Sequence, residues 1–279
     1  KKVLNKKFLF VNERVSFKKA KIIMNANMIR HIPILDNKKK IVGLHSLEDY
    51  EQKKIENNFV IMAGGFGKRL LPFTKKIPKP MLRTGNKPIL EHIIINAKKN
   101  GLKNFCICVH YLHKKIISYF KNGKKFEVKI KYIIEKSPRG TAGALKLLKL
   151  NNSEPIFLCN GDVLADINYS KLLEYHKKFN ADITVVVRNI IQKNRYGLVK
   201  LSTNKIIDFS EKQDLVMNIN AGIYVLKPKI IKYVKKEKLD MSEFLISLIK
   251  KKKRVFAYPL YENWIDVGTK ENLESTRKN

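Results

Sequence analysis

The chain lacks several features that would assign it to a common structural class. It has no run of about 18 apolar residues, which argues against a membrane-spanning helix. Cysteine is scarce, because only Cys106, Cys108 and Cys159 occur, and their spacing forms no zinc-binding set. Acidic residues are also few, with 24 Asp and Glu against 58 Lys and Arg. The cysteine usage is typical of a reduced, cytoplasmic protein.

Two common phosphate-binding motifs are absent, although a glycine-rich stretch is present. Residues 62–80 read MAGGFGKRLLPFTKKIPKP. A P-loop needs Gly-Lys followed by Ser or Thr, whereas Gly67 and Lys68 are followed by Arg69. A dinucleotide fingerprint needs a third glycine three residues after Gly67, where this chain has Leu70. A glycine-rich turn still lets the backbone approach a phosphate closely, so the stretch indicates a phosphate site of another type.

The formal net charge of +34 has three interpretations. Lysine and arginine can neutralise the phosphates of a nucleic acid, or they can attract small anionic substrates. The excess can also reflect a composition that is rich in Lys, Ile and Asn throughout. Because the lysines are scattered and no aromatic residues interleave with them, the third interpretation is favoured. We therefore expect no nucleic-acid partner and no membrane partner.

Residues 58–269 alternate between strand and helix patterns. Short apolar or alternating runs predict strands at 58–65, 104–110, 126–135, 155–162, 181–188 and 220–228. Helical spacing predicts helices at 87–101, 113–123, 140–150, 169–180 and 240–253, the last with a capping-box-like start at Asp240 and Glu243. Residues 196–212 predict a hairpin that turns at Thr203 and Asn204. The pattern predicts an α/β fold with a Rossmann-like, mostly parallel mixed sheet, whose ligands lie at the carboxyl ends of the strands.

The first 55 residues have a different pattern and are too few to bury a stable core alone. They predict a helix, a strand at 31–35, an Asp-Asn turn, a strand at 40–46 and a new helix start. This order resembles one CBS motif, and CBS motifs normally work in pairs. We therefore expect residues 1–55 to be half of a truncated CBS pair, with an extension that merely packs or dimerises as the alternative. Because residue 1 is Lys rather than Met, we expect the chain to be a fragment.

Seven short segments occur in one order along residues 58–279. They are MAGGFGKRLLPFTKKIPKPML at 62–82, GTAGAL at 140–145, NGD at 160–162, RYG at 195–197, SEK at 210–212, NAGIYV at 220–225 and WIDVG at 264–268. Together they resemble the sugar-1-phosphate nucleotidylyltransferases, which have the nucleotide-diphospho-sugar transferase fold. The resemblance is closest to a subgroup with preceding CBS motifs, which includes glucosamine-1-phosphate and mannose-1-phosphate guanylyltransferases.

The resemblance implies roles for particular residues. Catalytic roles fall on Arg69, Lys79 and Asp162; nucleotide-binding roles on Ala63, Gly64, Gly65, Gly67, Gly140 and Thr141; and sugar-phosphate-binding roles on Tyr196, Gly197, Glu211, Lys212 and Asn220. Asp162 and Asp266 are the implied ligands of Mg²⁺, a cation that prefers oxygen ligands and shares its shell with phosphates. The residue types suit the chemistry, since an Arg fork binds phosphate oxygens bidentately and phosphoryl-type transfer depends on positioning and charge stabilisation.

The expected reaction joins a nucleoside triphosphate and an aldose-1-phosphate to give a nucleoside-diphosphate sugar and pyrophosphate. Subgroup resemblance favours GTP with glucosamine-1-phosphate or mannose-1-phosphate. Thymidylyl, uridylyl or cytidylyl transfer to glucose-1-phosphate is the alternative within the class. A sensor that binds sugar nucleotides without turnover is the alternative from another class. The sequence leaves open whether the chain forms a homo-oligomer.

Overall fold

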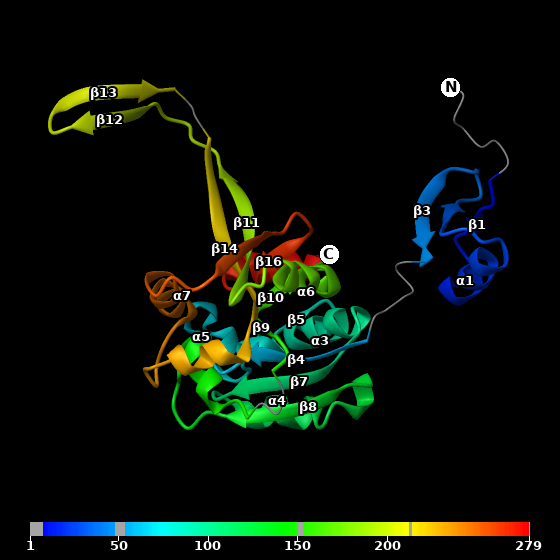
Figure 1. Ribbon diagram of the computed structural model, residues 1–279, viewed down its shortest axis with the longest axis horizontal. Coiled ribbons are helices and arrows are strands. Elements are labelled where there is room, and N and C mark those ends of the chain that lie inside the picture. Colours follow the sequence, from blue (N-terminus) through cyan, green and yellow to red (C-terminus); the bar gives the residue numbers. More distant parts are fainter. Residues whose placement is uncertain (1–7, 48–53, 150–152, 212–213, 279) are drawn as a thin grey trace. The chain divides into compact units, whose positions relative to one another are not determined.

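A computed structural model describes residues 8–47, 54–149, 153–211 and 214–278 (Figure 1). The chain divides into two compact units, Lys1–Lys54 and Ile55–Asn279. No helix in the described part of the chain combines the length and the apolar character that crossing a membrane requires.

The first unit is one helix with a small three-stranded sheet. Helix α1 (Phe17–Ala26) follows strand β1 (Val11–Asn12) and precedes β2 (His31–Leu35) and β3 (Ile41–Ser46), in the sheet order β1-β2-β3. Its core is small, consisting of Val11, Ala20, Met24 and Ile32. The predicted helix and the two predicted strands are present, whereas the predicted helix start after residue 47 lies outside the described residues. The assignment of this unit to half of a CBS pair stays a prediction.

The second unit is built on a seven-stranded sheet with the order β15-β11-β14-β9-β4-β7-β8. The strands are β4 (Ile55–Met62), β7 (Leu102–Val109), β8 (Lys129–Ile134), β9 (Ile156–Asn160), β11 (Ile183–Gln192), β14 (Leu215–Leu226) and β15 (Val255–Pro259). Strands β9, β4, β7 and β8 are mutually parallel, and β14 runs antiparallel to both of its neighbours. The predicted mixed, mostly parallel sheet is therefore confirmed.

Helices cover both faces of this sheet, because its central strands are apolar on both sides. In β4, Phe59 and Ile61 belong to one core cluster and Val60 to the other, as the two-residue period of a strand requires. The first cluster includes buried residues of α3 (Ile89–Lys99), α4 (His113–Phe120), α6 (Tyr169–Lys178) and α8 (Lys270–Lys278). The second includes residues of α5 (Gly140–Gly143) and α7 (Met241–Lys250). Each buried Ile or Phe side chain stabilises the fold by about 1.5–3 kcal/mol.

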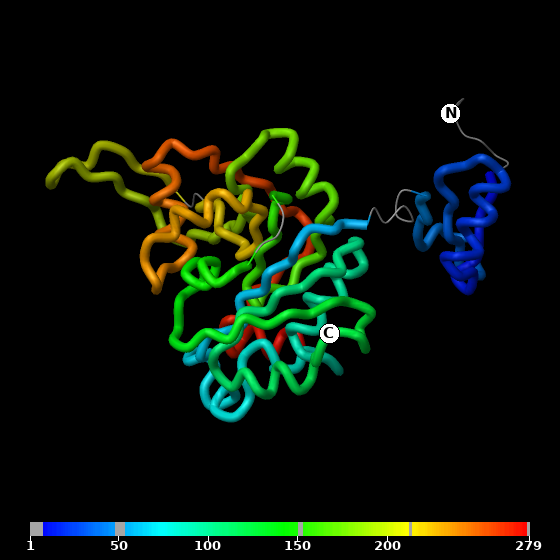
Figure 2. Tube along the Cα trace, turned by 60° about the horizontal axis from the view of Figure 1, so that its bottom comes forward, coloured from blue at the N-terminus to red at the C-terminus, as the bar shows by residue number. Residues whose placement is uncertain are grey.

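The second unit also contains short paired strands and 3₁₀ helices outside the seven-stranded sheet. Strands β5 (Arg83–Thr84) and β6 (Lys87–Pro88) pair with each other, as do β10 (Val163–Ala165) and β16 (Trp264–Asp266), and β12 (Leu198–Ser202) and β13 (Lys205–Ser210). Short 3₁₀ helices lie at Lys68–Leu70, Phe73–Lys75, Lys79–Met81, Lys124–Phe126, Ala144–Leu147 and Pro228–Tyr233. Helix α8, red in Figure 2, contacts β5, which belongs to the cyan segment that follows β4. The β10–β16 pair brings two segments of the chain together that lie about a hundred residues apart.

Three local predictions need correction. The predicted helix over 140–150 is the single turn α5 followed by a 3₁₀ turn, and the strand predicted from residue 126 begins at Lys129 after a 3₁₀ turn. Asp240 is the N-cap residue of α7, but its side chain makes no capping hydrogen bond within that helix. Its Oδ1 instead accepts the backbone N–H of Thr141 at 3.2 Å, so Asp240 ties α7 to α5. The predicted hairpin turn at Thr203 and Asn204 is confirmed.

Candidate active site

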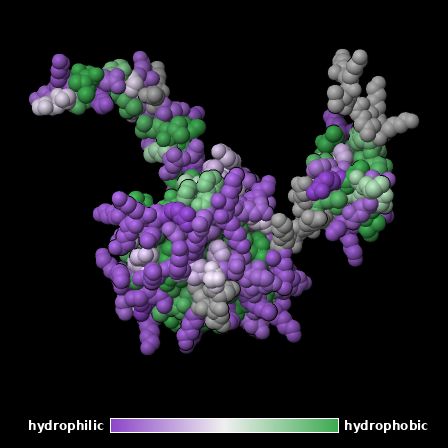
Figure 3. All heavy atoms as spheres, viewed as in Figure 1, coloured by the Kyte–Doolittle hydropathy of each residue, from purple (hydrophilic) through white to green (hydrophobic). Residues whose placement is uncertain are grey.

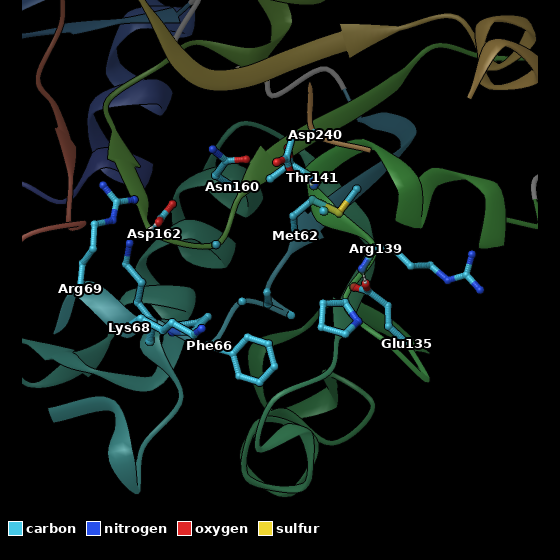
Figure 4. A pocket seen from close by; sticks show the side chains of 18 of the residues that line it. Met62, Phe66, Lys68, Arg69, Glu135, Arg139, Thr141, Asn160, Asp162 and Asp240 are labelled. Carbon is cyan, nitrogen blue, oxygen red and sulfur yellow. Dashed lines mark hydrogen bonds and ion pairs between the residues drawn. The ribbon is translucent and has the colours of Figure 1, made fainter. Parts of the chain in front are cut away.

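A pocket of about 530 Å³ opens at the carboxyl ends of β4, β8 and β9. Open parallel sheets bind ligands at this edge, because the loops that leave neighbouring strands meet there. The described residues that line the pocket come from the segments 62–69, 79–80, 135–141, 160–162 and 238–240, together with Asp266. Figure 4 shows Arg69 and Asp162 on one side of the pocket, and Glu135 and Arg139 on the other.

The glycine-rich loop forms the floor of the pocket next to Arg69. Ala63, Gly64 and Gly65 line the pocket itself. Gly67 lines an adjoining hollow of about 220 Å³ that also borders Arg69, Lys79 and Asp162. The amides of Gly64, Gly65 and Gly67 donate to no acceptor in the described part of the chain, so a phosphate oxygen can accept from them.

Gly67 is required by its own backbone conformation. Its φ of +66° lies in the left-handed region that L-residues with a Cβ seldom adopt. A Cβ at this position would also lie 2.8 Å from Cγ2 of Thr74 and 3.2 Å from Cβ of Lys79. The absence of a Cβ therefore lets the loop pass close to the segment that carries Lys79.

Lys79 lies between the two predicted metal ligands. Its Nζ forms an ion pair with Oδ2 of Asp162 and lies 4.0 Å from Oδ1 of Asp266. The two carboxylates are held in place by the β10–β16 ladder, in which Val163 pairs with Asp266, and by a 2.9 Å hydrogen bond from the N–H of Val267 to the carbonyl of Asp162. Residues that lie 104 positions apart in the sequence are thus brought to one point by backbone pairing.

The electrostatics of this cluster depend on Asp266. Burial raises the pKa of its carboxyl group, and the nearby negative charge of Asp162 raises it further. The positive charges of Lys79 and Arg69 act in the opposite direction. The Oδ1 atom of Asp266 is buried and accepts no hydrogen bond in the described part of the chain. A cation at this point would therefore offset the free-energy cost of burying this oxygen without a hydrogen bond.

Glu135 forms the opposite end of the pocket. Its side chain is buried, and its Oε2 accepts the backbone N–H of Arg139 at 3.0 Å. Burial raises the pKa of this carboxyl group, while the hydrogen bond from Arg139 lowers it. Its Oε1 lies next to Gly64, which lines the pocket, because a Cβ added to Gly64 would lie 2.8 Å from this oxygen. No described residue donates a hydrogen bond to Oε1, which leaves one acceptor for a ligand.

The segment after Glu135 closes the same end. Gly140 has φ +72°, and a Cβ there would lie 2.5 Å from Oδ1 of Asp240. Thr141 donates its amide to Asp240, and its Oγ1 accepts the N–H of Met241 at 2.8 Å. Gly140, Thr141 and Asp240 all line the pocket. Two hydrogen-bonded chain segments therefore build this end of the pocket together.

Glu135 and Asn160 are pocket residues to which the sequence analysis gave no role. Glu135 ends a predicted strand at the edge where ligands were expected, so the rule that drew attention to Asp162 also applies to it. Asn160 precedes Asp162 by two residues, and its Oδ1 is buried without a hydrogen bond to any described residue. Only the structure identifies this further acceptor, since the sequence gives no signal for an unpaired atom.

The predicted sugar-phosphate residues that the structure describes do not line the pocket. Tyr196 and Gly197 precede β12, and Glu211 follows β13, so these three belong to the hairpin. The side chain of Tyr196 is 78% exposed. Asn220 lies on β14, where its Nδ2 donates to the Tyr224 hydroxyl at 2.6 Å and its Oδ1 accepts the N–H of Gly222. Lys212 lies outside the described residues.

The donor set fits a small divalent cation that shares its ligands with phosphate. Asp162 and Asp266 offer carboxylate oxygens, one of them buried and without a hydrogen bond. No cluster of three or more His, Cys, Asp or Glu side chains that could hold a metal occurs among the described residues. Two carboxylates suit Mg²⁺, which keeps waters and substrate phosphates among its ligands.

Comparisons with known proteins agree with this geometry. The profile of the nucleotidyl transferase family matches residues 58–279. The chain is similar to the mannose-1-phosphate guanyltransferase of Yarrowia lipolytica, with 33% identity over 224 residues, 77% of this chain and 62% of that protein. The Saccharomyces cerevisiae protein of the same name is 31% identical over 226 residues, again 77% of this chain and 62% of that protein. This chain therefore spans less than two thirds of the length of these relatives.

Among solved structures, HddC from Yersinia pseudotuberculosis complexed with GMP-PN is 25% identical, with a TM-score of 0.63. The match covers 80% of this chain and 98% of that one.

Proposed function

The chain belongs to the nucleotidyl transferase family, and on that premise we propose that it is a sugar-1-phosphate nucleotidylyltransferase that uses GTP. The observation that carries the proposal is the two-ended pocket. One end has unpaired amides, Arg69, Lys79 and two carboxylates, and the other has the buried acceptor of Glu135. A triphosphate needs the first end and a base needs the second.

The acceptor at the base end favours guanine. Guanine presents two N–H donors, N1–H and the N2 amino group, along one edge. Uracil and thymine flank their single N–H with two carbonyl oxygens, which a carboxylate would repel. Oε1 of Glu135 accepts from no described residue, so it can take a guanine N–H without losing its bond from Arg139. The relatives named mannose-1-phosphate guanyltransferases support the same choice of base.

In the proposed reaction, a phosphate oxygen of the sugar-1-phosphate attacks the α-phosphorus of GTP. The bond from the α-phosphorus to the bridging oxygen breaks, and pyrophosphate leaves with the electron pair. The amides of Gly64, Gly65 and Gly67, together with the Arg69 guanidinium, would hold the β- and γ-phosphates and stabilise the leaving group. Lys79 would neutralise the attacking or the α-phosphate oxygens. Positioning and charge stabilisation account for most of the catalysis in this kind of transfer.

Asp162 and Asp266 are the proposed holders of Mg²⁺, which when bound neutralises the phosphate oxygens near the reacting phosphorus. For the sugar, the names of the relatives favour mannose-1-phosphate over glucosamine-1-phosphate. Tyr196, Gly197, Glu211, Lys212 and Asn220 remain proposed sugar-phosphate contacts. A cytoplasmic location and the absence of a nucleic-acid partner stay predictions.

The test is pyrophosphate release with Mg²⁺ across five nucleoside triphosphates and a panel of aldose-1-phosphates. We expect release with GTP and mannose-1-phosphate, and markedly less with the pyrimidine nucleotides. Preference for UTP or dTTP with glucose-1-phosphate would overturn the guanine assignment and favour the alternative within the family. Tight nucleotide binding without release from any pair would favour a sugar-nucleotide sensor.

A further inference from the structure

Lys79 occupies the place between two carboxylates that a metal would also need. Its ammonium pairs with Asp162 and lies 4.0 Å from Oδ1 of Asp266. Its side chain is only 11% exposed, so the ammonium is a component of the cluster and not a surface charge. In electrostatic terms, Lys79 serves here as a single positive charge that partly compensates two negative ones.

The carboxylates are fixed, whereas the ammonium can move. Asp162 and Asp266 are positioned by the β10–β16 ladder and by the bond from Val267. The backbone of Lys79 is held between Pro78 and Pro80 and against Gly67, but its side chain is a flexible four-carbon stem. Lys79 also lines both the main pocket and the smaller adjoining hollow, so phosphates placed in either would lie within its reach.

We propose that Lys79 is an exchangeable occupant of the metal site. Its ammonium must leave Asp162 and Asp266 before the carboxylates can hold a divalent cation, and a phosphate oxygen is its alternative partner. A compact ammonium and a divalent cation at one carboxylate pair repel each other strongly. A bound triphosphate offers Lys79 new negative partners, so nucleotide binding favours release of the carboxylates. The consequence is an order of events in which the nucleotide binds before, or together with, the metal. This inference rests on the proposed function, but it makes a claim about the free protein.

The experiment measures binding of Mn²⁺, as a spectroscopic substitute for Mg²⁺, to the full chain without nucleotide by electron paramagnetic resonance. Removing the competing charge in Lys79→Met should tighten Mn²⁺ binding about tenfold. Lys79→Arg keeps the charge and should bind Mn²⁺ like the unmodified protein. Lys76→Met is the matched control, since it removes one lysine charge from the same segment without touching the carboxylates. Equal affinity in Lys79→Met and the unmodified protein would overturn the inference.

A second measurement needs no variant. Acetic anhydride labels free lysine amines, and mass spectrometry reports the extent of labelling at Lys79 and Lys76 in the unmodified chain. Saturating Mg²⁺ should increase labelling of Lys79 several-fold because it displaces the ammonium, with no change at Lys76. Labelling of Lys79 that stays constant on adding Mg²⁺ would contradict the exchange.

Failure of the inference is distinguishable from failure of the proposed function. Pyrophosphate release by the unmodified chain, together with unchanged Mn²⁺ affinity in Lys79→Met, would leave the function standing and remove the exchange. Tighter Mn²⁺ binding in Lys79→Met, with no release from any substrate pair, would leave the exchange standing and remove the function.

Discussion

The pocket and the hairpin of β12 and β13 carry residues that motif resemblance assigns to one active site, but the fold supports them differently. Asp162 follows the buried strand β9, Glu135 follows the edge strand β8, and the backbones of both residues are hydrogen-bonded to neighbouring segments. In the hairpin, the side chains of Val199, Ile206 and Phe209 are all exposed. Figure 3 shows apolar residues along the hairpin, and Figure 1 shows it continuing from the ends of β11 and β14.

The difference teaches which part of a motif the core can position. When a strand is buried on both faces, its register in the sheet is fixed, and so is the position of the residue at its end. A two-stranded hairpin without a covering layer is at best marginally stable alone, so the core does not position its tip. We therefore expect substitutions at the reacting end of the pocket to affect the chemical step, and substitutions in the hairpin to affect mainly the binding of one substrate.

The largest expected effect is that of Asp162→Asn. The change keeps the size of the side chain and removes the charge that pairs with Lys79. Loss of one preorganised electrostatic contact typically lowers the rate about 10²- to 10³-fold, and we expect kcat to fall within that range. Steady-state pyrophosphate release at saturating substrates measures it.

Asp182→Asn is the matched control for that change. Asp182 is a buried carboxylate whose Oδ1 lies 3.4 Å from the Nζ of Lys229, but it does not line the pocket. Its loss should lower stability and leave kcat unchanged. If Asp162→Asn retained its release rate, the assignment of Asp162 to the reacting end would be wrong.

The sequence predicted the parallel sheet because long apolar strands alternate with amphipathic helices, and it predicted Asp162 because a carboxylate follows such a strand. The meeting of Asp162 with Asp266 was implied only by the family resemblance. Residue pattern alone could not predict it, because it depends on pairing between two three-residue strands that have no periodicity of their own. The true partner of Asp240 was missed for a related reason. A local capping rule considers only the helix itself, whereas Thr141 lies 99 residues away and competes successfully for the same oxygen.

A smaller effect is expected for Glu135→Gln, which changes base preference and not the chemical step. In glutamine an NH₂ group replaces one of the two carboxylate oxygens, so the side chain no longer has an acceptor at both positions, one for the Arg139 amide and one for a guanine N–H. A hydrogen bond to a charged group contributes about 1.5–3 kcal/mol, so kcat/KM for GTP should fall roughly 10- to 100-fold. Competition assays between GTP and UTP should show a smaller loss for UTP.

Glu91→Gln provides the control for loss of a buried carboxylate. Glu91 accepts from the Tyr119 hydroxyl at 2.6 Å and lies outside the pocket. Its substitution should leave the ratio of GTP to UTP use unchanged. Equal losses for both nucleotides in Glu135→Gln would show that Glu135 supports the pocket wall without reading the base.

The smallest effect is expected in the hairpin, and it tests whether the comparison between the two regions holds. If Glu211 accepts from a sugar hydroxyl, Glu211→Gln should raise KM for the sugar phosphate about threefold to tenfold, because a typical hydrogen bond contributes roughly 1 kcal/mol. KM for GTP and kcat should stay unchanged.

Asp208→Asn is the control, since Asp208 lies opposite Lys200 on the same hairpin. A fall in kcat of the size expected for Asp162→Asn would mean that the hairpin belongs to the reacting end, and the distinction between core-built and hairpin-borne residues would fail. An unchanged KM for the sugar phosphate would instead remove the hairpin from the site and leave sugar recognition to the pocket, where the free Oδ1 of Asn160 is the next acceptor to test.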